Sequence, residues 1–359
     1  MTKILNFLNN IFATLARLIN NIFGRKTAIF SIDSIKLAAS YVEQDLYDDF
    51  WPDIFNYKDY LQRPDLIGKI NFTKYSPKPI SAIDVPKPTY VLRPGHFISF
   101  VDRVYYQLLI GGFAKSLDDQ LASRGVSFGY RTSRKKKYFI DNNIENWKKF
   151  IGRDEQNFHD KPDGKLLVTD LSAFFEHIRF EHILERLNLY EVDSNIVSRL
   201  RKLLLFWNPS GIGIPQGNNC SSFLANVYLD EIDKAMLDDG YNYYRFVDDI
   251  RIFADDERTL RMAAARLTEL LRPLNLHLNG GKTELRDLAK HQSRKNEFAD
   301  EMAAIEYGIE TGVVGFMDGT ENKLKELWAA TVSSSHLDKT KFKYCVNRFR
   351  KIGSDFLRR

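Results

Sequence analysis

The sequence predicts an α+β fold in which helices back an antiparallel sheet. Tyr243–Ala254 carries two adjacent aspartates between runs of β-branched and aromatic residues, which predicts a β-hairpin with Asp248 and Asp249 at its tip. An apolar run at 166–168 predicts a buried strand that ends near Asp170. Helix-forming segments separate and follow these strands, so the sheet has helices available to cover it.

The chain opens with an amphipathic helix, which we assign to residues 1–30. Between Ile4 and Phe23 apolar residues recur every three or four positions, and polar residues occupy the other side. The polar positions argue against a transmembrane span, and the segment lacks the compact apolar region and cleavage site of a signal peptide. We expect this helix to pack on its own domain. Self-association or contact with a partner protein is the second interpretation, and a membrane interface is the third.

Helices also dominate the prediction for residues 31–160. Ser34–Ile70 has a helical pattern, and the prolines clustered between Tyr75 and Pro88 indicate an extended loop. A strand is expected at 89–94. The residues from 95 onward are predicted to lead into one helix that continues through residue 121.

The acidic strands belong to a segment that we place at residues 161–310. After Asp170 we expect a bend and then one helix that runs to about Leu189. A loop between Gly213 and Gly217 precedes a further helix.

Three further elements are predicted between the hairpin and the tail. Glu257–Pro273 has a helical apolar face, residues 274–278 predict an edge strand, and Gly280-Gly281 predicts a turn before Lys282. The tail at 311–359 is predicted to be helical and basic.

Composition sets broad limits on function. The chain has 359 residues, enough for two or three domains, and its net charge of +5 suits a polyanionic partner without proving one. The two cysteines, Cys220 and Cys345, provide no disulfide framework or zinc cluster. A reducing cytoplasm is the expected compartment.

The paired aspartates indicate cation chemistry. Two carboxylates at a tight turn make a poor core and a good site for a hard divalent cation. A solvated Asp-Asp turn is the alternative. Asp170 favours the cation site, because a carboxylate at the end of a neighbouring strand lies where open sheets place ligands.

Several stretches resemble the motifs of a reverse transcriptase and follow one another along the chain in the order of those motifs. Asp170–Phe175, Ile214–Gly217 and Phe246–Asp249 are similar to motifs A, B and C of the palm. Leu278–Thr283 resembles motif D, and Arg93–Gln107 with Ser127–Arg131 resembles the fingers motifs of bacterial enzymes. The resemblance, from about Val85 to Thr283, implies a right-hand polymerase. Its fingers would occupy 31–160, its RRM-like palm 161–310 and a short thumb-like segment 311–359.

The resemblance also implies a two-metal nucleotidyl transfer that uses Mg²⁺, or Mn²⁺ in its place. Asp170 and Asp248 would bridge the two ions, and the Leu171 carbonyl would add an oxygen. Asp249 would ligate or tune from beside them. Lys282 would neutralise the triphosphate or protonate the pyrophosphate.

Five residues are implied in nucleotide binding. Phe175 would lie beneath the ribose and exclude a 2′-hydroxyl, so that the enzyme uses dNTPs and its product is DNA. Gln216 and Gly217 would support the incoming nucleotide. Arg93 and Lys87 would clamp its phosphates from the fingers.

A basic run follows the second fingers motif. Such a run is usually a solvated face, but its place beside the fingers favours contact with the phosphates of an RNA template. The residues concerned are Arg131, Arg134, Lys135, Lys136 and Lys137.

The form of the motifs suggests a subgroup. Phe246–Asp249, the Arg93-Pro stretch and the helical tail are most similar to abortive-infection and defence-associated reverse transcriptases of bacteria. That similarity implies anti-phage defence, with a dedicated non-coding RNA, untemplated synthesis or protein priming as options. The alternatives are a retron-like or group II intron-like reverse transcriptase, an RNA-synthesising palm enzyme, and a catalytically inactive nucleic-acid-binding relative.

Overall fold

The computed structural model describes residues 30–48, 74–86, 92–141, 143–291, 314–335 and 337–352, with single residues and short pieces elsewhere. The amphipathic N-terminal segment and Lys87 lie outside the described residues. No described helix is both long and apolar enough to cross a membrane.

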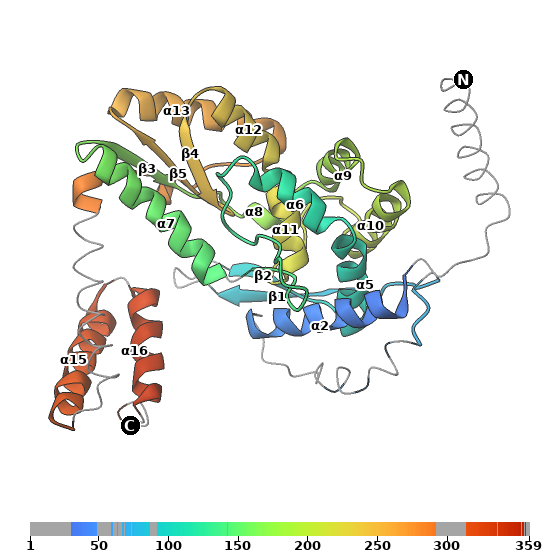
Figure 1. The fold of residues 1–359 in the computed structure, drawn as a ribbon, viewed down its shortest axis with the longest axis horizontal. Helices are drawn as coiled ribbons and strands as arrows, with labels where there is room; N and C mark the ends of the chain where they lie inside the picture. Colours follow the sequence, from blue (N-terminus) through green and yellow to red (C-terminus); the bar gives the residue numbers. More distant parts are fainter. Residues whose placement is uncertain are drawn as a thin grey trace, which may run out of the picture.

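The larger of the two described sheets has four antiparallel strands and lies between layers of helices (Figure 1). Its strand order is β4 (Asn242–Phe246), β5 (Asp249–Ala254), β3 (Lys165–Thr169) and β6 (Glu284–Asp287). The inner strands are the apolar ones, because both of their faces are covered. The predicted edge strand at 274–278 is wrong. A 3-10 turn at Arg272–Leu274 precedes this stretch, and β6 takes the edge of the sheet instead.

Helices cover the two faces of the sheet, and side chains alternate between them. On one face Tyr244 contacts α7 (Asn143–Asp160), where its hydroxyl donates to Asp154 at 2.7 Å. On the other face Tyr243 contacts α12 (Asp230–Asp238), and α13 (Glu257–Leu271) packs alongside. The predicted helix at 257–273 is therefore present and ends at Leu271.

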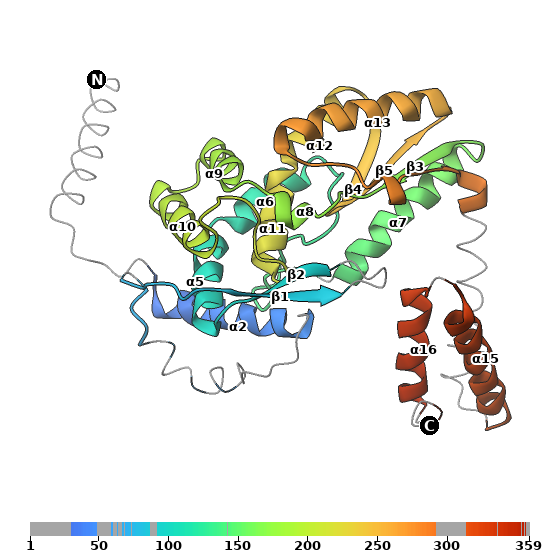
Figure 2. The same ribbon diagram turned by 180° about the vertical axis from the view of Figure 1, so that it is seen from behind.

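A second, two-stranded sheet lies beneath this assembly (Figures 1 and 2). It pairs β1 (Ser81–Pro86) with β2 (Leu92–Phe97), and α2 (Ile32–Asp48) packs against α5 (Phe100–Gly111). The helix expected to continue through residue 121 is interrupted. It stops at the Gly111-Gly112 pair, and α6 (Ala114–Ala122) begins after it.

The segment after Asp170 differs from the prediction of one continuous helix. It forms α8 (Phe174–His177) and α9 (Phe180–Leu189), separated by extended backbone at Ile178 and Arg179. The break has a partner, since the loop at 211–213 forms backbone hydrogen bonds with residues 178–180. Two further helices follow, α10 (Ser194–Trp207) and α11 (Asn219–Tyr228).

The described core is continuous from Ile35 to Leu288, so the segments expected as fingers and palm share one set of buried residues. The tail forms α15 (Val314–Ser333) and α16 (Lys339–Lys351), as its helical pattern predicts. These two helices bury a separate cluster, which contains Leu324, Leu327, Tyr344, Cys345 and Phe349.

Candidate active site

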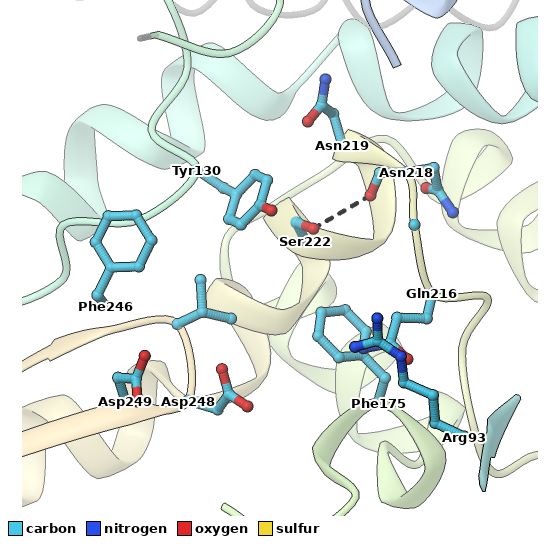
Figure 3. A pocket seen from close by; sticks show the side chains of 12 residues that line it. Arg93, Tyr130, Phe175, Gln216, Asn218, Asn219, Ser222, Phe246, Asp248 and Asp249 are labelled. Atoms are coloured by element: carbon cyan, nitrogen blue, oxygen red, sulfur yellow. Dashed lines mark hydrogen bonds between the residues drawn. The ribbon is translucent and has the colours of Figure 1, made fainter. Parts of the chain in front are cut away.

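A pocket of about 390 Å³ opens where the acidic hairpin faces α8 and the loop before α11 (Figure 3). It brings together residues that are distant in the sequence, from β2, α8, the loop before α11 and the β4–β5 hairpin. The sequence-predicted residues that line it are Arg93, Phe175, Gln216, Gly217, Asp248 and Asp249.

The hairpin tip is tighter than the sequence suggested. Phe246 pairs with Asp249, so the loop contains only Val247 and Asp248, and Asp249 is already the first residue of β5. Val247 has a φ of 58°, which is rare for a β-branched residue, and its side chain is buried. This turn sends the Asp248 carboxylate to the side of the pocket that faces Phe175 (Figure 3).

Asp170 lies beside the hairpin because of strand register. Thr169 pairs with Ile250, so Asp170 and Asp249 are the next residues along two antiparallel strands. Asp170 is 6% exposed, and its Oδ2 accepts a hydrogen bond from Lys282 Nζ. Its Oδ1 is buried and has no hydrogen-bond partner among the described residues.

The carboxylates influence one another. Burial and, after it, repulsion from Asp249 and Asp170 raise the pKa of Asp248 to about 7. Burial and the charge of Asp170 also raise the pKa of Asp249. Burial opposes a higher pKa for Lys282, but its hydrogen bond to Asp170 raises it overall. Three carboxylates therefore share a single ammonium, and the site has an excess of negative charge.

This donor set fits divalent cations. The described side chains do not form a ready-made cluster of three metal-binding groups. Asp170 Oδ1 is nevertheless a buried carboxylate oxygen without a hydrogen-bond partner among the described residues, a costly arrangement that a cation would relieve. Two backbone hydrogen bonds hold the adjacent bend, and they use the Asp170 carbonyl and the Ser172 N–H rather than the Leu171 carbonyl. Carboxylate and carbonyl oxygens are the ligands that Mg²⁺ and Mn²⁺ prefer.

The other wall of the pocket has the features of a nucleotide site. Phe175 lines it, and Arg93 and Gln216 lie next to that ring (Figure 3). Gly217 has a φ of 95°, a backbone conformation that favours glycine, and it turns the chain into α11. The Gln216 N–H donates to His96 Nδ1 at 3.4 Å, which ties this loop to β2.

Several lining residues were not found from the sequence. Tyr130, Asn218, Asn219, Ser222 and Phe246 also face the pocket. Asn218 has a local signal, because an Asn just before a helix is a favoured N-cap, and its side chain accepts from the Ser221 N–H at 2.8 Å. The others depend on which segments meet in three dimensions.

A buried ionic cluster lies next to the hairpin turn. The sequence did not predict this cluster. Arg245 is 1% exposed and makes 2.7 Å hydrogen bonds to Asp233 through both Nε and one terminal nitrogen. Its other terminal nitrogen donates to Asn226 and to the Val247 carbonyl. Asn226 in turn donates to the Gly129 carbonyl at 2.7 Å. The turn that carries Asp248 is thus fixed by hydrogen bonds on its inner side.

The basic run divides into two parts. Arg131 is a correction to the predicted phosphate contacts, because its side chain is 11% exposed and forms an internal ion pair with Asp118 at 3.0 Å. The remaining four residues, Arg134, Lys135, Lys136 and Lys137, are exposed on a loop closed by the Thr132–Ile140 bridge.

Comparison with protein families decides the assignment. The family model for reverse transcriptase (RNA-dependent DNA polymerase) matches residues 85–327. The chain belongs to the reverse transcriptase family. The predicted fold and enzyme class, an RNA-directed DNA polymerase, are confirmed at the level of this family.

The reverse transcriptase domain also matches solved structures. No curated protein matches the chain. The apo telomerase from Candida tropicalis truncated from its C-terminal domain is 11% identical, with a TM-score of 0.41 over 59% of this chain and 51% of that one. Candida albicans telomerase in complex with a TWJ fragment of telomeric RNA is 10% identical, with a TM-score of 0.45 over 66% and 48%. The chain therefore spans about half the length of these telomerases.

Proposed function

We propose that this chain is an RNA-directed DNA polymerase that joins deoxynucleotides by two-metal nucleotidyl transfer. The supporting observation is the pocket in which the Asp248 carboxylate, the Phe175 ring and the Arg93 guanidinium face one space. A primer end would enter beside the carboxylates, and a dNTP would occupy the wall formed by Phe175 and Gln216.

In the reaction a 3′-hydroxyl oxygen attacks the α-phosphorus of the dNTP and pyrophosphate leaves. Asp170 and Asp248, with the Leu171 carbonyl, would hold two cations. These would activate the hydroxyl and neutralise the leaving group. Asp249 would add negative charge beside them. Arg93 would hold the triphosphate, which its permanent positive charge suits.

Lys282 has a specific part in this proposal. Its ammonium is paired with Asp170 in the described structure. If Asp170 holds a cation, the Lys282 ammonium would be free to turn toward the negatively charged leaving group. There its ammonium would neutralise or protonate pyrophosphate, a proton transfer to the group that departs.

The biological role that we propose is bacterial anti-phage defence in a reducing cytoplasm. Its support is the similarity of the Arg93-Pro stretch, the Phe-Val-Asp-Asp hairpin and the helical tail to defence-associated enzymes. The proposed partners are an RNA template, with a dedicated non-coding RNA as one option, and a protein that contacts residues 1–30. That protein would be a second copy of this chain or a different partner. A plaque assay that compares wild type with Asp248→Asn in a bacterial host tests this role, and equal protection would contradict it.

Primer extension on an RNA template tests the chemistry. Asp248→Asn removes one ligand charge and should raise the activation free energy by several kcal/mol. The rate of extension should therefore fall on the order of 100-fold or more. Asp255→Asn is the matched control, because Asp255 is a 59% exposed surface acid just after the same strand. Extension by Asp248→Asn at the rate of this control would overturn the assignment.

Two further arms separate the alternatives. EDTA should abolish extension, and added Mg²⁺ or Mn²⁺ should restore it. Equal use of rNTPs and dNTPs would favour the RNA-synthesising alternative, and no extension with either would favour an inactive binding protein.

A further inference from the structure

A second pocket, of about 510 Å³, lies on another part of the surface. It is formed by residues 74–77, by α5 and by one side of α10, and it shares no lining residue with the catalytic pocket. Along the long axis of the molecule, α11 lies between α10 and the β4–β5 hairpin (Figures 1 and 2). The two pockets therefore lie at separate places on the surface.

Three cations surround this second pocket without compensating charge. Lys74, Arg199 and Lys202 line it, and none has an ion-pair partner among the residues that the structure describes. The neighbouring Arg201 is different, since both of its terminal nitrogens bind Glu181, at 2.6 and 2.7 Å. The described lining also includes no carboxylate. The pocket is consequently an uncompensated positive concavity.

Aromatic rings complete the pocket. Phe206 lies one turn beyond Lys202 on α10 and is 46% exposed, which is a large apolar surface in contact with water. Tyr75 and Tyr105 also line the pocket. Tyr75 is held in place by a 2.8 Å hydrogen bond from its hydroxyl to Asp102 and by an edge contact with Tyr105 at 5.2 Å between ring centroids.

We propose that this pocket binds an unpaired segment of nucleic acid, with phosphates at Lys74, Arg199 and Lys202 and a base against Phe206. Positive side chains beside an exposed aromatic ring are the combination by which proteins hold single strands. An acidic peptide would use the cations but would leave Phe206 without a partner. The site goes beyond polymerisation, because it gives the enzyme a second hold on a strand outside the catalytic pocket.

Salt-dependent binding of a fluorescent ten-nucleotide oligouridine RNA to the full chain, in EDTA and without dNTPs, tests the phosphate contacts. Each single-strand phosphate contact contributes about 0.7 to the slope of log affinity against log salt, so Arg199→Gln/Lys202→Gln should lower the slope by about 1.4. The matched control is Lys234→Gln/Arg258→Gln, which removes the same charge from exposed positions elsewhere. A slope for the α10 variant equal to that of the control would overturn the proposal.

Substitution of Phe206 tests the base contact. Loss of one stacking contact should weaken binding by about 5- to 150-fold in Phe206→Leu, which keeps an apolar side chain and so protects the fold, whereas Phe206→Trp should bind as wild type does. Equal affinity of the Leu and Trp variants would exclude a stacking role. Both measurements are made in EDTA and without dNTPs, so they report RNA binding alone, which separates this site from any failure of the proposed polymerase activity.

Crosslinking locates the strand directly. With 4-thiouridine in the same RNA, adducts are expected on Tyr75 or on residues 195–206. Adducts confined to the catalytic pocket would overturn the proposal. The alternative result is that an oligoglutamate peptide displaces the RNA and binds wild type and Phe206→Leu with equal affinity. That result would identify a peptide site and would also contradict the proposal.

Discussion

Phe174 and Phe175 are adjacent, yet the fold gives their rings different environments. Phe174 is 2% exposed and packs 6.3 Å from the Tyr228 ring, centroid to centroid. Phe175 lines the candidate active-site pocket opposite Asp248. The short α8 turn that begins at Phe174 separates the two directions. One aromatic ring therefore serves the core, and the other is available to contact a bound sugar.

Phe175→Ala should admit ribonucleotides. The wild-type ring would leave a 2′-hydroxyl buried without a hydrogen bond, at about 1–3 kcal/mol, so the substitution should reduce dNTP-over-rNTP preference by about 5- to 150-fold. Single-nucleotide incorporation with each substrate measures this ratio. Phe174→Ala is the control, and it should keep the preference while losing about 3–5 kcal/mol of unfolding free energy. An unchanged preference in Phe175→Ala would show that Phe175 is not the sugar gate.

Gly129 should position the catalytic hairpin through its lack of a side chain. A Cβ at this residue would lie 2.7 Å from Val247 Cγ2 and 3.2 Å from the Phe246 ring. Gly129→Ala should therefore displace the turn and cost about 1–3 kcal/mol of unfolding free energy. It should also lower kcat, with a smaller change in KM. Gly152→Ala is the control, because nothing lies within 4 Å of its added Cβ and alanine favours the helix. Equal kcat for the two variants would contradict this role.

Strands and helices around the hairpin are joined by the buried Arg245–Asp233 pair. Arg245→Leu would leave the Asp233 carboxylate, 4% exposed, without its cation, and should cost about 3–5 kcal/mol of unfolding free energy in urea titrations. Arg245→Leu/Asp233→Leu should recover much of that loss, because no unpaired charge remains buried.

A surface pair provides the comparison for this experiment. Arg266 and Asp239 are 39% and 35% exposed, and Arg266→Leu should cost about 0–1 kcal/mol. If Arg245→Leu were no more damaging than Arg266→Leu, the buried cluster would not be what holds the hairpin.

Local sequence patterns predicted helices and strands well where one periodicity ran through the segment. They predicted poorly where contact with a distant segment determines the structure. The hairpin follows from the β-branched and aromatic runs on either side of two aspartates, and α13 follows from its apolar helix face. The break before α9 arises because residues 178–180 pair with residues 211–213, which no local signal shows. Arg131 failed for the same reason, since its place in a basic run says nothing about Asp118 beside it.

The candidate site was predictable to the extent that its motifs are contiguous. Asp170 and Asp248 come from two short stretches, and strand register alone brings them together. Lys282 was expected near the triphosphate, and the structure places it against Asp170. Gly129 and Tyr130 belong to the Ser127–Arg131 stretch that resembles a fingers motif, but their contact with the hairpin could not be predicted, because it depends on how closely this loop approaches the hairpin.

Net positive charge, +5 over the chain, is concentrated in part on the loop of residues 134–137. Lys135→Ala/Lys136→Ala/Lys137→Ala should weaken RNA binding regardless of sequence and should flatten its salt dependence by about 2, because about three phosphate contacts are lost. Fluorescence anisotropy over a salt series measures the slope. Arg131→Ala should instead destabilise the fold, because it leaves the buried Asp118 without its cation. An unaltered slope in the triple variant would make this loop an ordinary solvated surface.

The contact between residues 126–128 and Arg245 has a practical consequence. The Arg245 N–H donates to the Val126 carbonyl at 2.8 Å, and the Arg245 carbonyl accepts from the Phe128 N–H at 3.0 Å, so the loop of residues 126–128 completes the outer edge of β4. A fragment beginning at residue 161 would expose that edge as an unpaired strand, which invites aggregation. The boundary predicted at residue 160 therefore does not separate two independently folding units. Two polypeptides divided there would have to associate with each other to cover the edge of β4 and remain soluble.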